Sequence, residues 1–263
     1  MPVISVNSDH SPLFKEFELI INDEKLLAQQ IGDLMLGHQH HVENILRAKK
    51  GSVAYSPNDV IDKAIEKLVV VEDHERYKRD GWIFQFMTWI TLNVENRKVP
   101  FKCQIPHPAP AMHGIDGLGV VLSKNKEIVK IIISEDKYTE NPRKKIKEEV
   151  WPEFRTFEER VYDSHIVSIV TGLIRDLSIK EINMAVQRDL YNMDLRTYRV
   201  GITPRVQNHI GNGKRRLFKG YDNCVKRAVH DKREALTFSQ ADIRDWMDKI
   251  SVKISKYLTS KKI

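Results

Sequence analysis

The sequence predicts a mixed α/β protein in which helices surround a hairpin of buried strands. Between His113 and Tyr138, two runs of β-branched residues flank the polar turn SKNKE, a pattern that indicates a β-hairpin. The run from Gly81 to Leu92 is apolar almost all round, which is typical of a helix covered on several sides. Apolar residues recur at helical spacing near both ends of the chain, so helices are expected there as well.

The composition fits a globular protein with a basic surface. The chain has 263 residues, and 41% of them are hydrophobic, which is sufficient for a sizeable core. Forty-three Lys and Arg against 36 Asp and Glu give a net charge of +7, which favours a polyanionic partner. Cys103 and Cys224 are too few for a disulfide framework or a cysteine-built zinc site, so we expect a reducing, cytoplasmic compartment. No run reaches the roughly 20 apolar residues of a membrane span, so no membrane association is expected.

The elements are expected in the following order. Helical spacing extends over residues 11–49 and resumes after Ser56. The central helix at Gly81–Leu92 comes next, followed by a short strand in VPFKCQ and a proline-rich loop that leads into the hairpin. Residues 140–178 alternate basic and apolar helical segments, and YRVGITPRV has the pattern of another strand. A basic loop and a capped amphipathic helix within residues 239–260 close the chain.

These elements predict one composite domain, because no internal repeat or low-complexity linker divides the chain. Residues 1–78 are expected to form a mainly helical N-terminal region and residues 79–200 the core. Residues 201–263 are expected to supply a basic loop and a C-terminal helix packed on that core.

The register of the hairpin brings three charged groups together. Its turn centres between Asn125 and Lys126, so the numbers of paired residues sum to about 251. This register places Asp116 opposite Glu135, and Lys137 projects from the same face as Glu135 because side chains alternate along a strand. The side chain of the intervening Asp136 is expected on the opposite face.

Two carboxylates placed opposite each other repel, and a divalent cation is the simplest way to offset that repulsion. Magnesium, or manganese in its place, prefers hard oxygen ligands. Asp116, Glu135 and the backbone carbonyl of Asp136 are the candidate ligands, and Lys137 is the candidate for positioning an attacking water. This set of groups predicts phosphodiester hydrolysis, and the alternative is an exposed salt-bridge cluster at the end of a hairpin.

Asp116 followed by Glu135-Asp136-Lys137 resembles the motif of the PD-(D/E)XK nuclease superfamily, in which an acid ends one strand and (D/E)-x-K lies on the next. The resemblance implies a restriction-endonuclease-like αβββαβ core within residues 79–200. Superfamily members usually carry Glu or Gln on the helix before the sheet, and Gln85 in RDGWIFQFMTWI stands in the matching place. The family often has a proline before the acid, where this chain has HGI.

Three segments between Arg79 and Arg143 are similar to a narrower group within that superfamily. RDGWIFQFMTWI, MHGIDGLGVV and SEDKYTENPR resemble the HamA nuclease subunits of Hachiman anti-phage defence and the related AbpA proteins. The resemblance implies a bacterial defence effector, a metal-dependent DNase that works with a superfamily 2 helicase, HamB, which restrains it until infection. Nothing in the composition or spacing indicates a helicase partner.

The chain contains a second (D/E)-x-K match, Asp23-Glu24-Lys25. It lies in a helical pattern without a preceding hairpin, so we interpret it as a solvated helix face. Basic side chains that are candidates for contact with nucleic acid, or else belong to a solvated surface, are Arg143, Lys144, Lys214, Arg215 and Arg216.

The expected function is therefore Mg²⁺-dependent cleavage of DNA. Two alternatives stay open. One is a catalytically inert subunit that binds DNA or regulates a helicase, and the other, less favoured, is an RNase on the same core.

Overall fold

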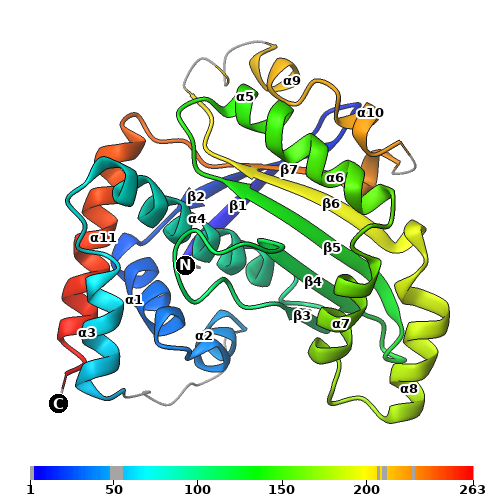
Figure 1. The fold of residues 1–263 in the computed structure, drawn as a ribbon, viewed down its shortest axis with the longest axis horizontal. Helices are drawn as coiled ribbons and strands as arrows, with labels where there is room; N and C mark the ends of the chain where they lie inside the picture. Colours follow the sequence, from blue (N-terminus) through cyan, green and yellow to red (C-terminus); the bar gives the residue numbers. More distant parts are fainter. Residues whose placement is uncertain (1–2, 48–55, 206–207, 209–211, 227–228, 263) are drawn as a thin grey trace.

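One mixed sheet runs through the centre of the protein (Figure 1). The computed structural model describes residues 3–47, 56–205, 208, 212–226 and 229–262. Within them, seven strands pair in the order β1-β2-β7-β6-β5-β4-β3. The strands are β1 (Ile4–His10), β2 (Lys15–Ile21), β3 (Phe101–Cys103), β4 (Gly117–Leu122), β5 (Ile128–Lys137), β6 (Arg196–Ile202) and β7 (Arg233–Thr237).

The sheet combines two antiparallel parts with a parallel centre. β1 pairs antiparallel with β2, and β3, β4 and β5 form an antiparallel meander at the other edge. Between them, β2, β7, β6 and β5 are mutually parallel neighbours. Parallel strands need a crossover connection, and between β5 and β6 the helical segment from α5 to η3 provides it.

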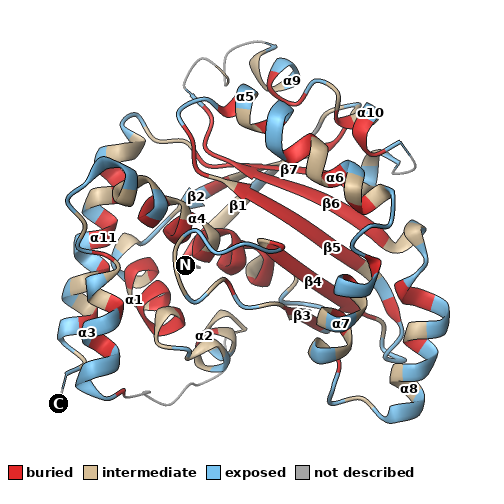
Figure 2. Cartoon of the chain, in the orientation of Figure 1, coloured by how far each residue is buried: buried red, intermediate tan, exposed pale blue. Residues whose placement is uncertain are grey.

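Helices cover both faces of the sheet, and each face has its own hydrophobic core. One face is covered by α1 (Glu24–Met35), α2 (Gln39–Leu46), α3 (Asn58–Glu66), α4 (Asp73–Glu95) and α11 (Ile243–Thr259). The other is covered by α5 (Pro142–Lys145), η1 (Ile146–Val150), α6 (Trp151–Glu158), α7 (Asp163–Leu173), α8 (Ile179–Met184), η2 (Ala185–Leu190), α9 (Gly213–Leu217) and α10 (Tyr221–Cys224). Two short 3₁₀ turns, η3 (Met193–Leu195) and η5 (His230–Lys232), precede β6 and β7. Figure 2 shows the central strands buried between these layers.

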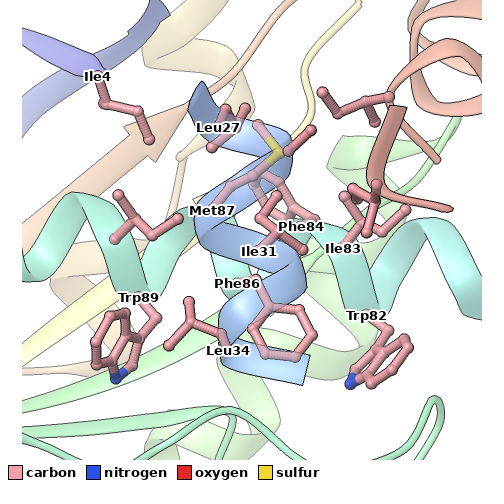
Figure 3. Packing of buried hydrophobic residues seen from close by; sticks show 14 of the residues in the cluster. Ile4, Leu27, Ile31, Leu34, Trp82, Ile83, Phe84, Phe86, Met87 and Trp89 are labelled. Carbon is pink, nitrogen blue, oxygen red and sulfur yellow. The ribbon is translucent and has the colours of Figure 1, made fainter. Parts of the chain in front are cut away.

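The predicted central helix is confirmed as α4, which lies between the sheet and α1. Its side chains are buried on several sides because both neighbours are apolar, and α1 lies across it in Figure 3. The side chains that meet there include Leu27, Ile31 and Leu34 of α1 and Trp82, Phe86 and Met87 of α4. Within the described ranges, no helix has the length and apolar character needed to cross a bilayer.

The predicted hairpin register is confirmed over most of the hairpin. Gly117 pairs with Ser134 and Val121 with Lys130, and the numbers in these pairs sum to 251. Nearer the turn the register shifts by one, so that Leu122 pairs with Ile128. The strand pattern YRVGITPRV corresponds to β6, and the closing helix is confirmed as α11, where the Asp242 side chain caps the first turn.

Three strands differ from the predicted assignments, and the first is β1, which lies in the region 1–78 that was predicted to be mainly helical. Residues 15–21, predicted to be helical, form β2, although the rest of the N-terminal region is largely helical. Phe17, Leu19 and Ile21 recur at every second position of β2 and pack in the same hydrophobic core. This strand alternation was present in the sequence, but it was interpreted as part of the longer helical spacing.

β7 was not predicted because it opens with the charged residues Arg233 and Glu234, although all five residues of the strand are buried. Pairing with β2 and β6, rather than a local pattern, fixes this strand.

Candidate active site

The end of the β4–β5 hairpin carries the charged residues that the sequence singled out. Asp116 directly precedes β4, and Glu135 and Lys137 are the last inward-facing residues of β5. Lys137 Nζ lies 2.5 Å from Glu135 Oε1 and 3.7 Å from Asp116 Oδ2. The structure therefore brings together the three groups that the register predicted.

Gln85 joins this group from α4. Its Nε2 donates a hydrogen bond to Asp116 Oδ1 at 2.6 Å, and the backbone N–H of Asp136 donates to Asp116 Oδ2 at 3.0 Å. Both carboxylate oxygens of Asp116 are thus held, one by a helix and one by the neighbouring strand. These two bonds fix the direction in which the carboxylate points.

These groups line a cavity of about 650 Å³. Asp116 and Glu135 lie deep in it, since their side chains are only 7% and 4% exposed, whereas Lys137 is 24% exposed. The remaining lining comes from the loop before β4, from α6 and from the start of α7, and consists of Met112, His113, Gly114, Ile115, Glu153, Tyr162 and His165.

Burial and like charge govern the protonation of the acids in the cavity. Burial raises the pKa of Glu135 well above its usual range, and the neighbouring Asp116 carboxylate raises it further, against the opposing effect of Lys137. Burial also opposes the charge of Lys137, but the Glu135 and Asp116 carboxylates outweigh it and raise the lysine pKa. Lys137 is therefore a cation that offsets two adjacent carboxylates.

The side chain of Asp136 lies on the opposite face of β5, as predicted. Its carboxylate accepts hydrogen bonds from Thr88 Oγ1 at 2.6 Å and Ser134 Oγ at 3.0 Å, on the α4 side of the sheet. Burial, together with the charge of Asp116, raises its pKa to about 7. The Asp136 carboxylate consequently does not line the cavity.

The main chain of Asp136 faces Asp116. Its N–H points to that side, and in an extended strand the N–H and C=O of one residue point the same way. The next carbonyl, of Lys137, accepts from Thr203 on the β6 side, as this alternation requires. Because β4 begins only at Gly117, the Asp136 carbonyl faces the space beyond the end of β4, next to the Asp116 carboxylate.

The donor set fits a hard divalent cation. The ammonium of Lys137 is within 4 Å of both carboxylates, so a single cation between them would be within reach of each. Asp116, Glu135 and the Asp136 carbonyl supply only oxygen ligands, which Mg²⁺ and Mn²⁺ prefer. No group of three or more His, Cys, Asp or Glu side chains is placed to hold a metal ion in the part of the chain that the structure describes. A metal here would therefore depend on the carbonyl and on water or substrate oxygens.

Gly201 provides the space for the Asp136 side chain. It lies opposite Asp136 on β6, and a Cβ atom at this position would overlap Asp136 Oδ1 and approach Thr88 Cγ2 to 3.2 Å. The Asp136 carboxylate is almost fully buried and accepts hydrogen bonds from Thr88 and Ser134, so moving aside would disturb these bonds.

We expect Gly201→Ala to lower the free energy of unfolding by about 1–3 kcal/mol, the usual cost of overpacking. Chemical denaturation measures this change. Gly81→Ala is the matched control, because a Cβ at Gly81 meets no atom within 4 Å outside its own helix, and alanine favours a helix by about 1 kcal/mol over glycine. Equal stability of Gly201→Ala and the wild type would contradict the steric argument.

The linear motif did not reveal the residues that α6 and α7 contribute to the cavity. Glu153 is half-buried there, and its pKa is raised by burial and by Asp116, against the opposing charge of Lys137. Tyr162 and His165 follow at the start of α7. Their positions depend on how the helical crossover folds back over the sheet, and no local signal in WPEFRTFEERVYDSH marks this path.

The five basic residues predicted for nucleic-acid contact differ in whether their side chains are free to reach a ligand or are already bound to other groups of the protein. Arg143 Nη1 donates to the carbonyls of Leu217 and Lys219 at 3.0 and 2.8 Å, which gives it a structural role between α5 and α9. Lys214 is paired with Glu16. Lys144, Arg215 and Arg216 are exposed, and none of the five lines the cavity.

The second (D/E)-x-K match has a structural role. The Asp23 side chain caps α1 by accepting from the Leu26 N–H at 2.9 Å, and Glu24 accepts from Trp246 Nε1 at 2.8 Å. Lys25 is exposed. The premise that no hairpin precedes this match was wrong, since the antiparallel strands β1 and β2 lie directly before it, but the match itself forms the start of a helix and its acids have structural partners.

Comparisons with known proteins do not place the chain in a family. No family model matches it, and no curated protein or solved structure matches it either.

Proposed function

We propose that this protein is a metal-dependent DNase that hydrolyses phosphodiester bonds. The observation that carries the proposal is the convergence of Asp116, Glu135 and Lys137 in one cavity, where two buried carboxylates share a lysine. Such a cluster is costly for a protein to maintain without a function, because each buried carboxylate loses its hydration. A salt-bridge cluster that only served the surface would not require carboxylates buried in a cavity.

The order of elements around the site supports a restriction-endonuclease-like core. From α4 through β3, β4 and β5, across the helical crossover to β6, the chain follows the order helix, three strands, helix, strand. The three strands form a meander, and the fourth pairs parallel with the third. This order supports the proposal of an αβββαβ core, which the resemblance to PD-(D/E)XK nucleases implies.

In the proposed mechanism, each residue of the cavity has a separate role. Asp116, Glu135 and the Asp136 carbonyl would hold Mg²⁺, which when bound supplies charge neutralisation for the phosphodiester. Gln85 holds the Asp116 carboxylate in its orientation. Lys137 positions the attacking water through its ammonium protons and balances the negative charge that develops on the phosphate oxygens.

The wider setting of the proposal follows from the resemblance to the HamA subunits. We propose an effector of bacterial anti-phage defence that acts in the cytoplasm and is restrained by a superfamily 2 helicase partner. The formal charge of +7 is compatible with DNA as substrate.

Cleavage of DNA by the purified chain, supplied as plasmid, linear duplex and single strand, tests the proposal. We expect cleavage with Mg²⁺ and none with EDTA. Asp116→Asn is expected to remove it, because the amide weakens the ligand set. Asp136→Asn is the matched control, since it changes a neighbouring carboxylate whose side chain points away from the cavity and leaves the main-chain carbonyl in place.

The alternatives give different results in the same assay. DNA binding without cleavage, in the presence and absence of the helicase, would indicate an inert DNA-binding or helicase-regulating subunit. Faster cleavage of RNA than of DNA of the same sequence would indicate an RNase.

A further inference from the structure

The exposed part of the cavity lining includes one aromatic and one apolar side chain, together with two histidines, His113 and His165. Tyr162, at the start of α7, is 39% exposed, and Met112, in the loop before β4, is 46% exposed. His165 lies three residues after Tyr162, so the two are neighbours on the same side of the helix. Single exposed apolar residues are ordinary on protein surfaces, but these border the same cavity as the buried carboxylates.

The Tyr162 ring packs against a buried aromatic side chain. Its centroid lies 5.1 Å from that of the buried Phe157, with 49° between the ring planes. The corner between α6 and α7 is further fixed by Arg160, which donates to the Tyr191 carbonyl at 2.6 Å. A rigid, partly exposed aromatic ring provides a preformed surface for stacking.

The charges of the cavity do not suit the backbone of an intact duplex. Among the lining residues that the structure describes, three are acidic, and Lys137 is the only Lys or Arg. Duplex binding depends on Lys and Arg placed along the phosphates. Aromatic stacking is instead the usual means by which proteins hold unpaired bases.

The depth of the carboxylates also favours an unpaired nucleotide over an intact duplex. Asp116 and Glu135 are almost fully buried at the base of a cavity of about 650 Å³, a size typical of pockets that enclose small ligands. In a duplex the bases are paired and stacked inside, so a base must leave the stack before it can turn toward a protein wall. An unpaired nucleotide has no such constraint and can place its phosphate at the carboxylates and its base on the wall.

We infer that the substrate is single-stranded DNA, with the base next to the scissile phosphate stacked on Tyr162. This inference rests on the proposed nuclease function and specifies its substrate class. Tyr162 is a binding residue in this scheme, and it contacts the base but not the reacting atoms.

Labelled oligonucleotides of one sequence test the inference in three forms: single-stranded, fully paired, and paired except for a short central gap. With Mg²⁺, the single strand and the gapped duplex are expected to be cut at least tenfold faster than the intact duplex. Tyr162→Ala is expected to raise KM for the single strand roughly tenfold with little change in kcat, and Tyr162→Phe to retain the wild-type value.

Tyr191→Ala is the matched control, because Tyr191 is 45% exposed but does not line the cavity. Equal cleavage of intact duplex and single strand would overturn the inference, as would equal KM values for Tyr162→Ala and Tyr191→Ala. If no substrate is cut, the nuclease proposal fails, and fluorescence anisotropy with the same labelled strands still decides the binding inference. Roughly tenfold weaker binding of the single strand by Tyr162→Ala would support it, and unchanged binding would overturn it.

Discussion

Lys137→Ala is expected to reduce DNA cleavage by roughly 10²–10³-fold, the usual effect of removing a group that stabilises charge in the transition state. Lys137 is the ammonium closest to both carboxylates, at 2.5 Å from Glu135 and 3.7 Å from Asp116. Lys124→Ala is the matched control, since this lysine is exposed in the turn at the other end of the same hairpin. Initial rates on single-stranded DNA and on plasmid DNA at saturating Mg²⁺ measure the effect.

The same substitution should change stability in a way that depends on metal and pH. Without Lys137 the two carboxylates lose their compensating charge, so the metal-free protein is expected to be less stable than the wild type. The pKa of Glu135 is already raised, and a raised carboxyl pKa means that stability is lost as pH rises through it. The deficit should therefore grow with pH.

Mg²⁺ separates this electrostatic effect from simple misfolding. Added metal should restore much of the lost stability of Lys137→Ala, because it supplies the missing positive charge, and thermal unfolding with EDTA or Mg²⁺ measures the recovery. Wild-type cleavage rates in Lys137→Ala, with the helicase partner present, would contradict the assigned role and favour the regulatory-subunit alternative.

Arg199→Met should cause the largest loss of stability, about 3–5 kcal/mol. Arg199 is fully buried on β6, where its guanidinium donates to Glu95 at 2.6 and 3.1 Å and to Glu234 at 3.2 Å. Its guanidinium also lies 5.1 Å from the centre of the Phe17 ring. Methionine fills similar space but leaves the carboxylates facing an apolar side chain.

Lys130→Met is the control for this prediction. Lys130 also binds Glu234, at 2.6 Å, but its side chain is 31% exposed. Water compensates for the loss of such a partner, so a change within about 1 kcal/mol is expected. Urea denaturation of the two variants compares a buried and a half-exposed cation that share one carboxylate. Equal losses would show that burial does not set the contribution of Arg199.

The parts of the site that follow from local rules were predictable from the sequence. The turn and the alternation of side chains determine which face carries Glu135 and Lys137, and this part of the prediction is confirmed. Gln85 was placed by its position in a resembling motif, and its hydrogen bond to Asp116 agrees with that placement.

The parts that depend on the path of the chain in space were not predictable. Glu153 and Tyr162 reach the cavity only because the crossover after β5 returns across the sheet. β7 has a weak pattern of its own, and its place in the sheet depends on pairing with β2 and β6, which are distant in the sequence. Arg143 looked like a free cation in a basic run, but the carbonyls that bind it lie more than 70 residues away in the sequence.

The position of β7 in the sheet sets an order of assembly during synthesis. β7 lies between β2 and β6, so the first hairpin of the chain cannot join the sheet until residues 233–237 have left the ribosome. By then β4, β5 and β6 have all been made, and their pairing needs no later segment. On a ribosome stalled before β7, we therefore expect the strands of the cavity to be paired already in the nascent chain. β1 and β2 are expected to remain unpaired with the rest of the sheet until β7 has been made.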